Sequence, residues 1–195
     1  MPILSAETDC FPANLLAGLA VSDHEAPLRG AETSDRTWWV MHTKPRQEKS
    51  VARDLLCREM SFYLPTISQT KIVRGRKQVS HLPLFTGYVF LFGNELERHS
   101  IMITNRIAHF LSVADPRLLT RQLHDLSRLI SAGAPLTVES RLKAGDQVRV
   151  KSGALAGVEG TVVARRRRCR MIVSVSLLQQ GVSIEIDDHL LEPIG

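Results

Sequence analysis

The sequence predicts two domains: an α+β domain, in which helices flank an antiparallel sheet, and a small all-β barrel after it. From Thr37 to Ser131, strand-like and helix-like segments alternate in the order expected of helices packed on an antiparallel sheet. Between Gly145 and Pro193 there are about five short alternating runs, which suffice for one small closed barrel. We expect an acidic, mostly disordered leader (1–36), the α+β domain (37–132), a linker (133–144) and the barrel domain (145–195).

The segments of the first domain follow from apolar periodicity and from turn residues. Aromatic and β-branched residues favour strands, and proline suits the first turn of a helix. A basic turn, Arg74–Lys77, joins two extended segments into a hairpin. The expected strands are 37–42, 62–65, 67–73, 78–82, 87–92 and 107–113, and the expected helices are 45–60, 95–104 and 116–131.

The leader and the barrel differ sharply in pattern. The leader mixes proline, glycine and acids, and only a short helix around Phe11, Leu15, Leu16 and Leu19 is expected in it. In the barrel, valine and isoleucine alternate with polar residues, and the loop glycines Gly153 and Gly157 permit a tight turn.

Charge is distributed unevenly along the 195 residues. The net charge is +5, but residues 1–36 carry six acids against two arginines, a balance of −4, which leaves +9 for the remainder. A basic body suits a protein that works beside nucleic acid, and a merely solvated basic surface is an equally good interpretation of charge alone.

Composition argues against several other classes of protein. No apolar run is long enough to cross a membrane, and no basic leader resembles a secretory signal. The three cysteines form no C-x-x-C pair, so we expect a reduced, cytoplasmic protein without disulfides or a metal. No P-loop, G-x-S-x-G or H-x-x-x-H pattern is found, and we therefore expect neither an enzyme nor a cofactor.

Four motifs in order resemble the NusG family. The run Trp38–Glu48 resembles the opening strand and helix of the NusG N-terminal domain. Pro83–Phe90 looks like its central signature, with Thr86 in place of the usual proline, and His99–Phe110 fits the second helix and the next strand. Gly145–Pro193 resembles the KOW motif, a small SH3-like barrel.

The resemblance implies a bacterial transcription elongation or antitermination factor. Such a factor binds the clamp helices of the largest RNA polymerase subunit and suppresses pausing or termination. Its KOW domain recruits a partner, either Rho or the ribosomal protein NusE. We expect a monomer without membrane contact. Four features favour a specialised paralogue: Thr86, the acidic leader, the arginine turn of the barrel, and the hairpin, which resembles that of the RfaH branch.

The resemblance also implies a polymerase-binding patch. Tyr88 and its neighbours alternate along their strand, so not all of them are expected to face one way, and filling the core is the alternative role for Phe90. The predicted polymerase-binding residues are Trp39, His42, Phe85, Tyr88, Phe90, His99, Ser100 and Thr104.

Basic residues of the first domain form a candidate nucleic-acid surface. Arginine and lysine bind phosphates without reading sequence, and the non-template DNA strand is the partner that the resemblance implies for Lys44 and Arg106. A solvated helix face is the alternative for the basic residues of the first helix. The predicted residues are Lys44, Arg46, Lys49, Arg53, Lys71, Arg74, Arg76, Lys77 and Arg106.

The barrel carries its own candidate site. Leu155 stands in a loop where housekeeping members of the family have an aromatic residue for their partners, which puts Rho binding in doubt. An arginine-rich turn nearby is suited to an anionic partner. The predicted partner- or anion-binding residues are Leu155, Arg165, Arg166, Arg167, Arg168 and Arg170.

Two alternatives remain open. A KOW-bearing ribosome- or RNA-binding protein would share the barrel and the basic charge, but it has no need of the first domain. An adaptor that joins polymerase to another machine would leave elongation itself unchanged.

Within the family, RfaH can fold its C-terminal domain as a helical hairpin. The β-branched alternation here predicts a stable barrel instead.

Overall fold

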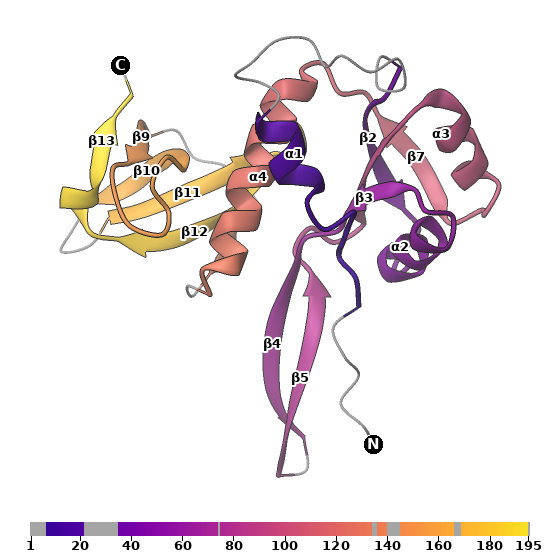
Figure 1. Cartoon of the computed structure of the whole chain (residues 1–195). Coiled ribbons are helices and arrows are strands. Elements are labelled where there is room, and N and C mark those ends of the chain that lie inside the picture. Colours follow the sequence, from indigo (N-terminus) through magenta and orange to yellow (C-terminus); the bar gives the residue numbers. More distant parts are fainter. Residues whose placement is uncertain are drawn as a thin grey trace. The chain divides into compact units, whose positions relative to one another are not determined.

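The computed structural model of the chain (Figure 1) describes residues 7–21, 35–73, 75–133, 136–139, 145–165 and 169–194. The chain divides into two compact units, residues 1–116 and 117–195. All strand pairs are antiparallel, and the few helices accompany the sheets, so the predicted α+β class with antiparallel sheets is confirmed. The finer domain boundaries stay a prediction.

The first unit is built on a five-stranded sheet with the order β1-β3-β6-β2-β7. A separate hairpin of two long strands projects from this unit (Figure 1). The sheet strands are β1 (Cys10–Phe11), β2 (Thr37–Thr43), β3 (Ser61–Tyr63), β6 (Tyr88–Gly93) and β7 (Ile107–Leu111), and the hairpin strands are β4 (Thr66–Val73) and β5 (Arg76–Pro83).

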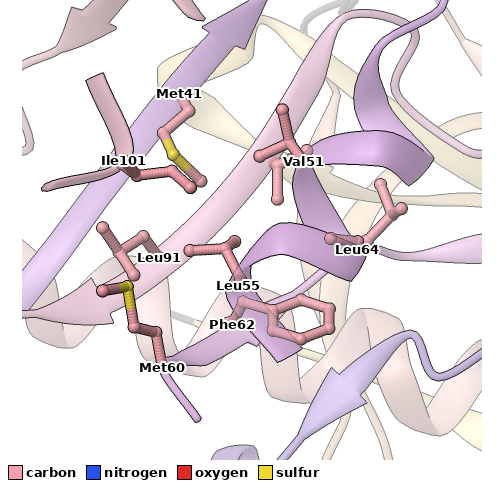
Figure 2. Packing of buried hydrophobic residues seen from close by; sticks show 10 residues of the cluster. Met41, Val51, Leu55, Met60, Phe62, Leu64, Leu91 and Ile101 are labelled. Atoms are coloured by element: carbon pink, nitrogen blue, oxygen red, sulfur yellow. The ribbon is translucent and has the colours of Figure 1, made fainter. Parts of the chain in front are cut away.

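In the described part of the first unit, the helices are α1 (Leu15–Val21), α2 (Glu48–Cys57) and α3 (Glu95–Met102). The helix α3 begins with a capping box, in which the Asn94 side chain accepts from the Glu97 amide and the Glu97 carboxylate accepts from the Asn94 amide. Apolar side chains of α2, α3 and one sheet face form the core, where Val51, Leu55 and Ile101 are fully buried (Figure 2).

Two predicted helices are shorter in the structure than the periodicity suggested. The first begins at Glu48 rather than Pro45 and ends at Cys57 rather than Met60. Residues with left-handed backbone, Arg46 (φ 60°) and Glu59 (φ 55°), lie just outside its ends, and such a backbone cannot continue a right-handed helix. The second ends at Met102 instead of Thr104, before Asn105 (φ 55°).

Part of the expected leader is structured. Residues 10–11 form β1, which pairs with β3, and residues 15–21 form α1. The predicted short helix is therefore confirmed for Leu15, Leu16 and Leu19, whereas Phe11 lies in β1 instead. The expectation of disorder for residues 1–6 and 22–34 lies outside the described residues.

The second unit is built on a six-stranded sheet with the order β13-β9-β10-β11-β12-β8. Its helix, α4 (Pro116–Ser131), has the predicted bounds, but it falls in this unit although we expected it to close the first domain. The short strand β8 lies in the expected linker. The strands are β8 (Thr137–Glu139), β9 (Asp146–Val150), β10 (Glu159–Arg165), β11 (Cys169–Val175), β12 (Gln180–Ile186) and β13 (Leu191–Pro193), and short 3-10 helices cover Ser176–Leu178 and Asp188–Leu190.

The glycines of the second unit have the roles that the sequence suggests. Gly153 and Gly157 have φ of 88° and 85° in the loop between β9 and β10. Gly160 is needed for a different reason, because a Cβ there would lie 2.6 Å from the Ile172 carbonyl oxygen of the adjacent strand. Within the described ranges, no helix is long and apolar enough to cross a membrane.

Candidate functional sites

The two faces of the first sheet carry different residues. On β2 and β6, Met41 pairs with Val89 on the face that packs against α2 and α3. On the opposite face, Val40 pairs with Phe90 and His42 pairs with Tyr88. We call this second face the aromatic face. It comprises Trp38, Val40, His42, Phe85, Tyr88, Phe90 and Phe92.

Phe85, Tyr88 and Phe90 gather on the aromatic face. The rings of Phe85 and Phe90 meet edge to face, with centroids 6.4 Å apart. The expected alternation was wrong for these three residues, because Phe85 precedes the strand and Gly87 (φ 85°) turns the chain between it and Tyr88. Phe85 and Phe90 are buried, at 1% and 0% exposure, whereas Tyr88 is half-buried.

Trp39, the remaining aromatic candidate, lies on the other face of the sheet. Its indole N–H donates to the Gly93 carbonyl over 3.0 Å, and its ring meets Phe110 edge to face. The Arg98 guanidinium lies 4.8 Å from its ring centroid. Trp39 is therefore held apart from the other predicted aromatic residues.

His42 lies between two other rings on the aromatic face. Its ring centroid is 5.1 Å from that of Tyr88 and 4.7 Å from that of His109. Its Nδ1 atom is buried and has no hydrogen-bond partner among the residues that the structure describes. His109 was not predicted from the sequence, and the pairing of β7 with β2 brings it opposite His42. Its position opposite His42 could have been predicted only from the correct register of β7 against β2.

The two hydroxyl candidates, on α3 and after it, donate to backbone carbonyls of the same segment. The Ser100 hydroxyl donates to the Glu97 carbonyl and the Thr104 hydroxyl donates to the Ile101 carbonyl, whereas His99 is exposed. Beside them are two strongly exposed apolar residues that were not predicted, Leu96 (80%) and Ile103 (75%). The two residues are seven positions apart, and this spacing could have indicated from the sequence that both lie on one side of the helix.

Lys44 and Arg106, predicted to face DNA, meet in the structure. The Lys44 amide donates to the Arg106 carbonyl over 2.8 Å, and the Lys44 ammonium donates to the Asn105 side chain. The Arg106 guanidinium pairs with Asp54 over 2.9 Å and donates to Gln47. Arg46 is exposed in the same connection before α2.

Lys49 and Arg53, the other two candidates on this helix, share an acidic neighbour. The Glu7 carboxylate accepts from Arg53 Nε over 2.9 Å and from Nη2 over 3.3 Å. Its distance to Lys49 Nζ is 4.0 Å. The hydrogen bond from Arg53 lowers the pKa of Glu7 below its usual value, against the opposing effect of burial. Glu7 was not predicted, because the sequence indicated no partner for the acids of the leader.

The hairpin presents basic and apolar residues together. Arg76 and Lys77 are exposed on β5, and Ile72 on β4 is 79% exposed. Lys71 pairs with Gln78 in the strand register, so the two arms of the predicted hairpin are confirmed. Arg74 and the side chain of Lys71 lie outside the described residues.

In the second unit, the candidates are only partly described. Leu155 is half-buried in the loop between β9 and β10. Arg170 is exposed and donates from Nε to the Ser183 hydroxyl over 3.1 Å. Residues 166–168, the centre of the predicted arginine turn, and the side chain of Arg165 lie outside the described residues.

No metal centre was found where the structure can be described. Over those ranges, His, Cys, Asp and Glu side chains do not gather in any group of three or more that could hold a metal ion. Cys10 and Cys57 are free thiols, and burial raises the pKa of Cys10 to about 11, which disfavours its thiolate form.

Comparison with known proteins gives one consistent result. A family model described as "Transcription termination factor nusG" matches residues 36–127. The transcription termination/antitermination protein NusG of Rickettsia felis is 25% identical over 175 residues, covering 82% of this chain and 91% of that protein. The protein of the same name from Thermus thermophilus is 27% identical over 173 residues, covering 77% and 94%.

Two solved structures are also similar. A structure titled "Domain interaction in Thermotoga maritima NusG" has a TM-score of 0.44 at 18% identity and covers 82% of this chain and 98% of that one. A structure of an MjSpt4:Spt5 complex has a TM-score of 0.26 at 11% identity and covers 81% and 97%. The family model over residues 36–127 and the relatives that match most of the chain's length together support membership of the NusG family.

Proposed function

We propose that this protein is a transcription termination/antitermination factor that binds RNA polymerase through its first unit. The observation that carries the proposal is the NusG family match over residues 36–127, which includes the sheet from β2 to β7 with α2 and α3. Relatives that match along most of their length are named for the same activity.

The aromatic face is the proposed contact for the clamp helices of the largest subunit. Protein interfaces concentrate their binding energy in a few aromatic anchors, which are surrounded by residues that exclude water. Tyr88, His42 and Phe92 are half-buried, so a partner can reach them without rearrangement of the face. Tyr88 and His42 are direct neighbours, with ring centroids 5.1 Å apart. Phe85 and Phe90 belong to the same face, where their rings are buried against each other.

The proposed mechanism is a shift between two states of the polymerase. A factor that binds the closed clamp more tightly than the opened one lowers the population of the paused, opened form by its differential affinity. This activity requires no chemistry from the factor itself.

Basic residues of the first unit would contact the DNA beside the polymerase. Lys44, Arg46 and Arg106 lie close together where β2 leads into α2 and where β7 begins. Arg76 and Lys77 are exposed on the hairpin. Contacts of this kind add affinity without sequence information.

The second unit is proposed to be a KOW barrel that recruits a protein partner, NusE or Rho. Support comes from its six-stranded antiparallel sheet and from the glycine-rich loop between β9 and β10, which carries Leu155. Since Leu155 is aliphatic and only half-buried, it offers a smaller anchor than an aromatic residue. Binding to NusE and to Rho should therefore be measured separately.

Co-purification with core RNA polymerase tests the proposal. The test variant is His42→Ala with Tyr88→Ala, and the control is His189→Ala, an exposed histidine in the second unit. Phe85 and Phe90 are left intact, because truncating a buried phenylalanine costs about 3–5 kcal/mol and would confuse unfolding with lost binding.

We expect the wild type and the control to bind polymerase and the double variant to lose at least tenfold in affinity, about 1.4 kcal/mol. Equal binding by all three proteins would show that the polymerase contact lies outside the aromatic face. If none of the three binds polymerase, the proposed function is wrong.

A further inference from the structure

The N-terminal segment is fixed to the sheet just before it reaches α2. In β1, Cys10 pairs with Tyr63 and Phe11 pairs with Phe62 on the edge of β3. The Leu64 amide donates to the Asp9 carbonyl over 2.6 Å, and Phe11 packs against the core of the first unit. Backbone pairing and apolar contact therefore determine where the preceding residues lie.

Glu7, which precedes this anchored stretch, meets the basic side of α2. Lys49 and Arg53 are four residues apart, so their side chains lie on one side of the helix. The Glu7 carboxylate engages both nitrogens of the Arg53 fork and lies 4.0 Å from the Lys49 ammonium. All three side chains remain partly open to solvent, with exposures of 38% for Glu7, 59% for Arg53 and 34% for Lys49.

A phosphate group of a nucleic acid can take the place of the Glu7 carboxylate in this arrangement. A phosphodiester, like a carboxylate, offers two anionic oxygens that an arginine fork binds side by side. An exposed ion pair contributes only about 0–1 kcal/mol, so the Glu7 contact is weak compared with the anchoring of the segment. Nucleic acid gains affinity by releasing counterions at each phosphate that the protein binds, an effect that a single carboxylate cannot match.

We propose that Lys49 and Arg53 form a phosphodiester-binding site for nucleic acid, which Glu7 occupies as an intramolecular competitor until nucleic acid displaces it. The inference rests on the proposed function, which brings nucleic acid close to the first unit. The competitor lowers affinity for free nucleic acid in the cell. DNA held beside a bound polymerase has a high effective concentration and can still displace Glu7.

The experiment measures binding of a fluorescein-labelled single-stranded DNA oligonucleotide by the full chain at several salt concentrations. The test variant is Glu7→Gln. The control is Glu59→Gln, which removes the same charge from an exposed position outside the predicted sites. Two further proteins carry Lys49→Ala with Arg53→Ala, one with Glu7 and one with Glu7→Gln.

We expect Glu7→Gln to bind the oligonucleotide about two- to fivefold more tightly than the wild type, the range that corresponds to one exposed ion pair. Its dependence on salt should also be steeper, by up to about 0.7 in slope for each additional phosphate that the protein binds. The increase in affinity should be larger than that of Glu59→Gln, and it should disappear when Lys49 and Arg53 are replaced.

Three results would overturn the proposal. They are an equal increase in affinity in Glu59→Gln, an increase that persists without Lys49 and Arg53, and the absence of DNA binding by every variant at low salt. Co-purification with polymerase reads out the proposed function independently of DNA. A protein that binds polymerase but shows any of these three results retains its proposed function and loses only the competitor role of Glu7.

Discussion

The buried carboxylate of Glu48 accepts a hydrogen bond from the backbone amide of Gly87 over 2.7 Å. The Gly87 carbonyl in turn accepts from the Thr43 amide over 2.8 Å. The turn at Gly87 is thereby hydrogen-bonded both to Thr43, at the end of β2, and to Glu48, the first residue of α2. This turn brings Phe85 onto the same face as Tyr88. The Glu48–Gly87 hydrogen bond therefore helps to fix the position of Phe85 on the aromatic face.

Replacement of Glu48 by alanine should destabilise the first unit by about 1–3 kcal/mol, because the buried Gly87 amide loses its partner. Glu48→Gln keeps an oxygen acceptor and should lose less. Both tryptophans of the chain, Trp38 and Trp39, lie in the first unit, so urea unfolding followed by tryptophan fluorescence reports on it. Equal midpoints for Glu48→Ala, Glu48→Gln and the wild type would contradict the role assigned to this contact.

Gly87→Ala should destabilise the same unit by about 1–2 kcal/mol, the usual cost of a left-handed backbone for a residue with a Cβ. Gly87 has φ 85°, and a Cβ would lie 3.4 Å from Nε2 of His42. The matched control is Gly18→Ala in α1, where a Cβ meets nothing within 4 Å. There alanine should be neutral or stabilising by about 0.5–1 kcal/mol, and a larger loss at Gly18 than at Gly87 would refute this explanation.

Arg76→Ala with Lys77→Ala should weaken binding of single-stranded DNA to a similar degree for every sequence. If both side chains contact phosphates, the slope of log K against log salt should become shallower by about 1.4, since each contact contributes about 0.7. Both residues are exposed, so stability should change by less than about 0.5 kcal/mol. An unchanged slope would show that these residues of the hairpin do not contact phosphate.

Local patterns in the sequence predicted the elements better than their partners. The spacing of Leu119, Leu123 and Leu126 predicted a helix with the bounds observed for α4. In the structure these three leucines are buried along one side of it. The hairpin followed from a basic turn with Gly75, whose φ is 74°. Helix ends were less accurate, because residues such as Arg46 adopt a left-handed backbone that no side-chain pattern indicates.

Relationships between distant residues were beyond the sequence. Glu7 and Arg53 lie far apart in the chain, and their contact depends on the pairing of β1 with β3. The leader lacks the periodicity that would have predicted this pairing. Likewise, the separation of Trp39 from Tyr88 depends on the register of β2 against β6, which a single strand's pattern does not reveal.

Polar side chains of α4 connect it to the sheet of the second unit. The Gln122 side chain accepts from the Ser176 amide and donates to the Ser176 hydroxyl, each over 3.1 Å. The Arg128 guanidinium donates to the Ala154 carbonyl. Between them, the buried Asp125 carboxylate accepts from the Glu159 amide over 3.4 Å. The spacing of three residues places all three side chains along one side of the helix.

The last prediction concerns the pH dependence of this connection. Burial raises the pKa of Asp125 to about 6, although the Glu159 amide and Arg128 oppose the rise. In the unfolded chain the carboxyl titrates near its usual value, about 3.9. Between these values the folded state binds more protons than the unfolded state, so the stability from this group is complete below about pH 4 and is lost as pH rises through about 6.

Asp125→Asn removes this titration and should therefore stabilise the second unit at pH 8 by about 1–3 kcal/mol relative to the wild type. At pH 4 the two proteins should be equally stable. Scanning calorimetry across this range measures the difference, and Asp187→Asn, which makes the same substitution at an exposed aspartate, is the matched control. Parallel profiles for Asp125→Asn and the wild type would mean that Asp125 is solvated and that water reaches the contact between α4 and the sheet.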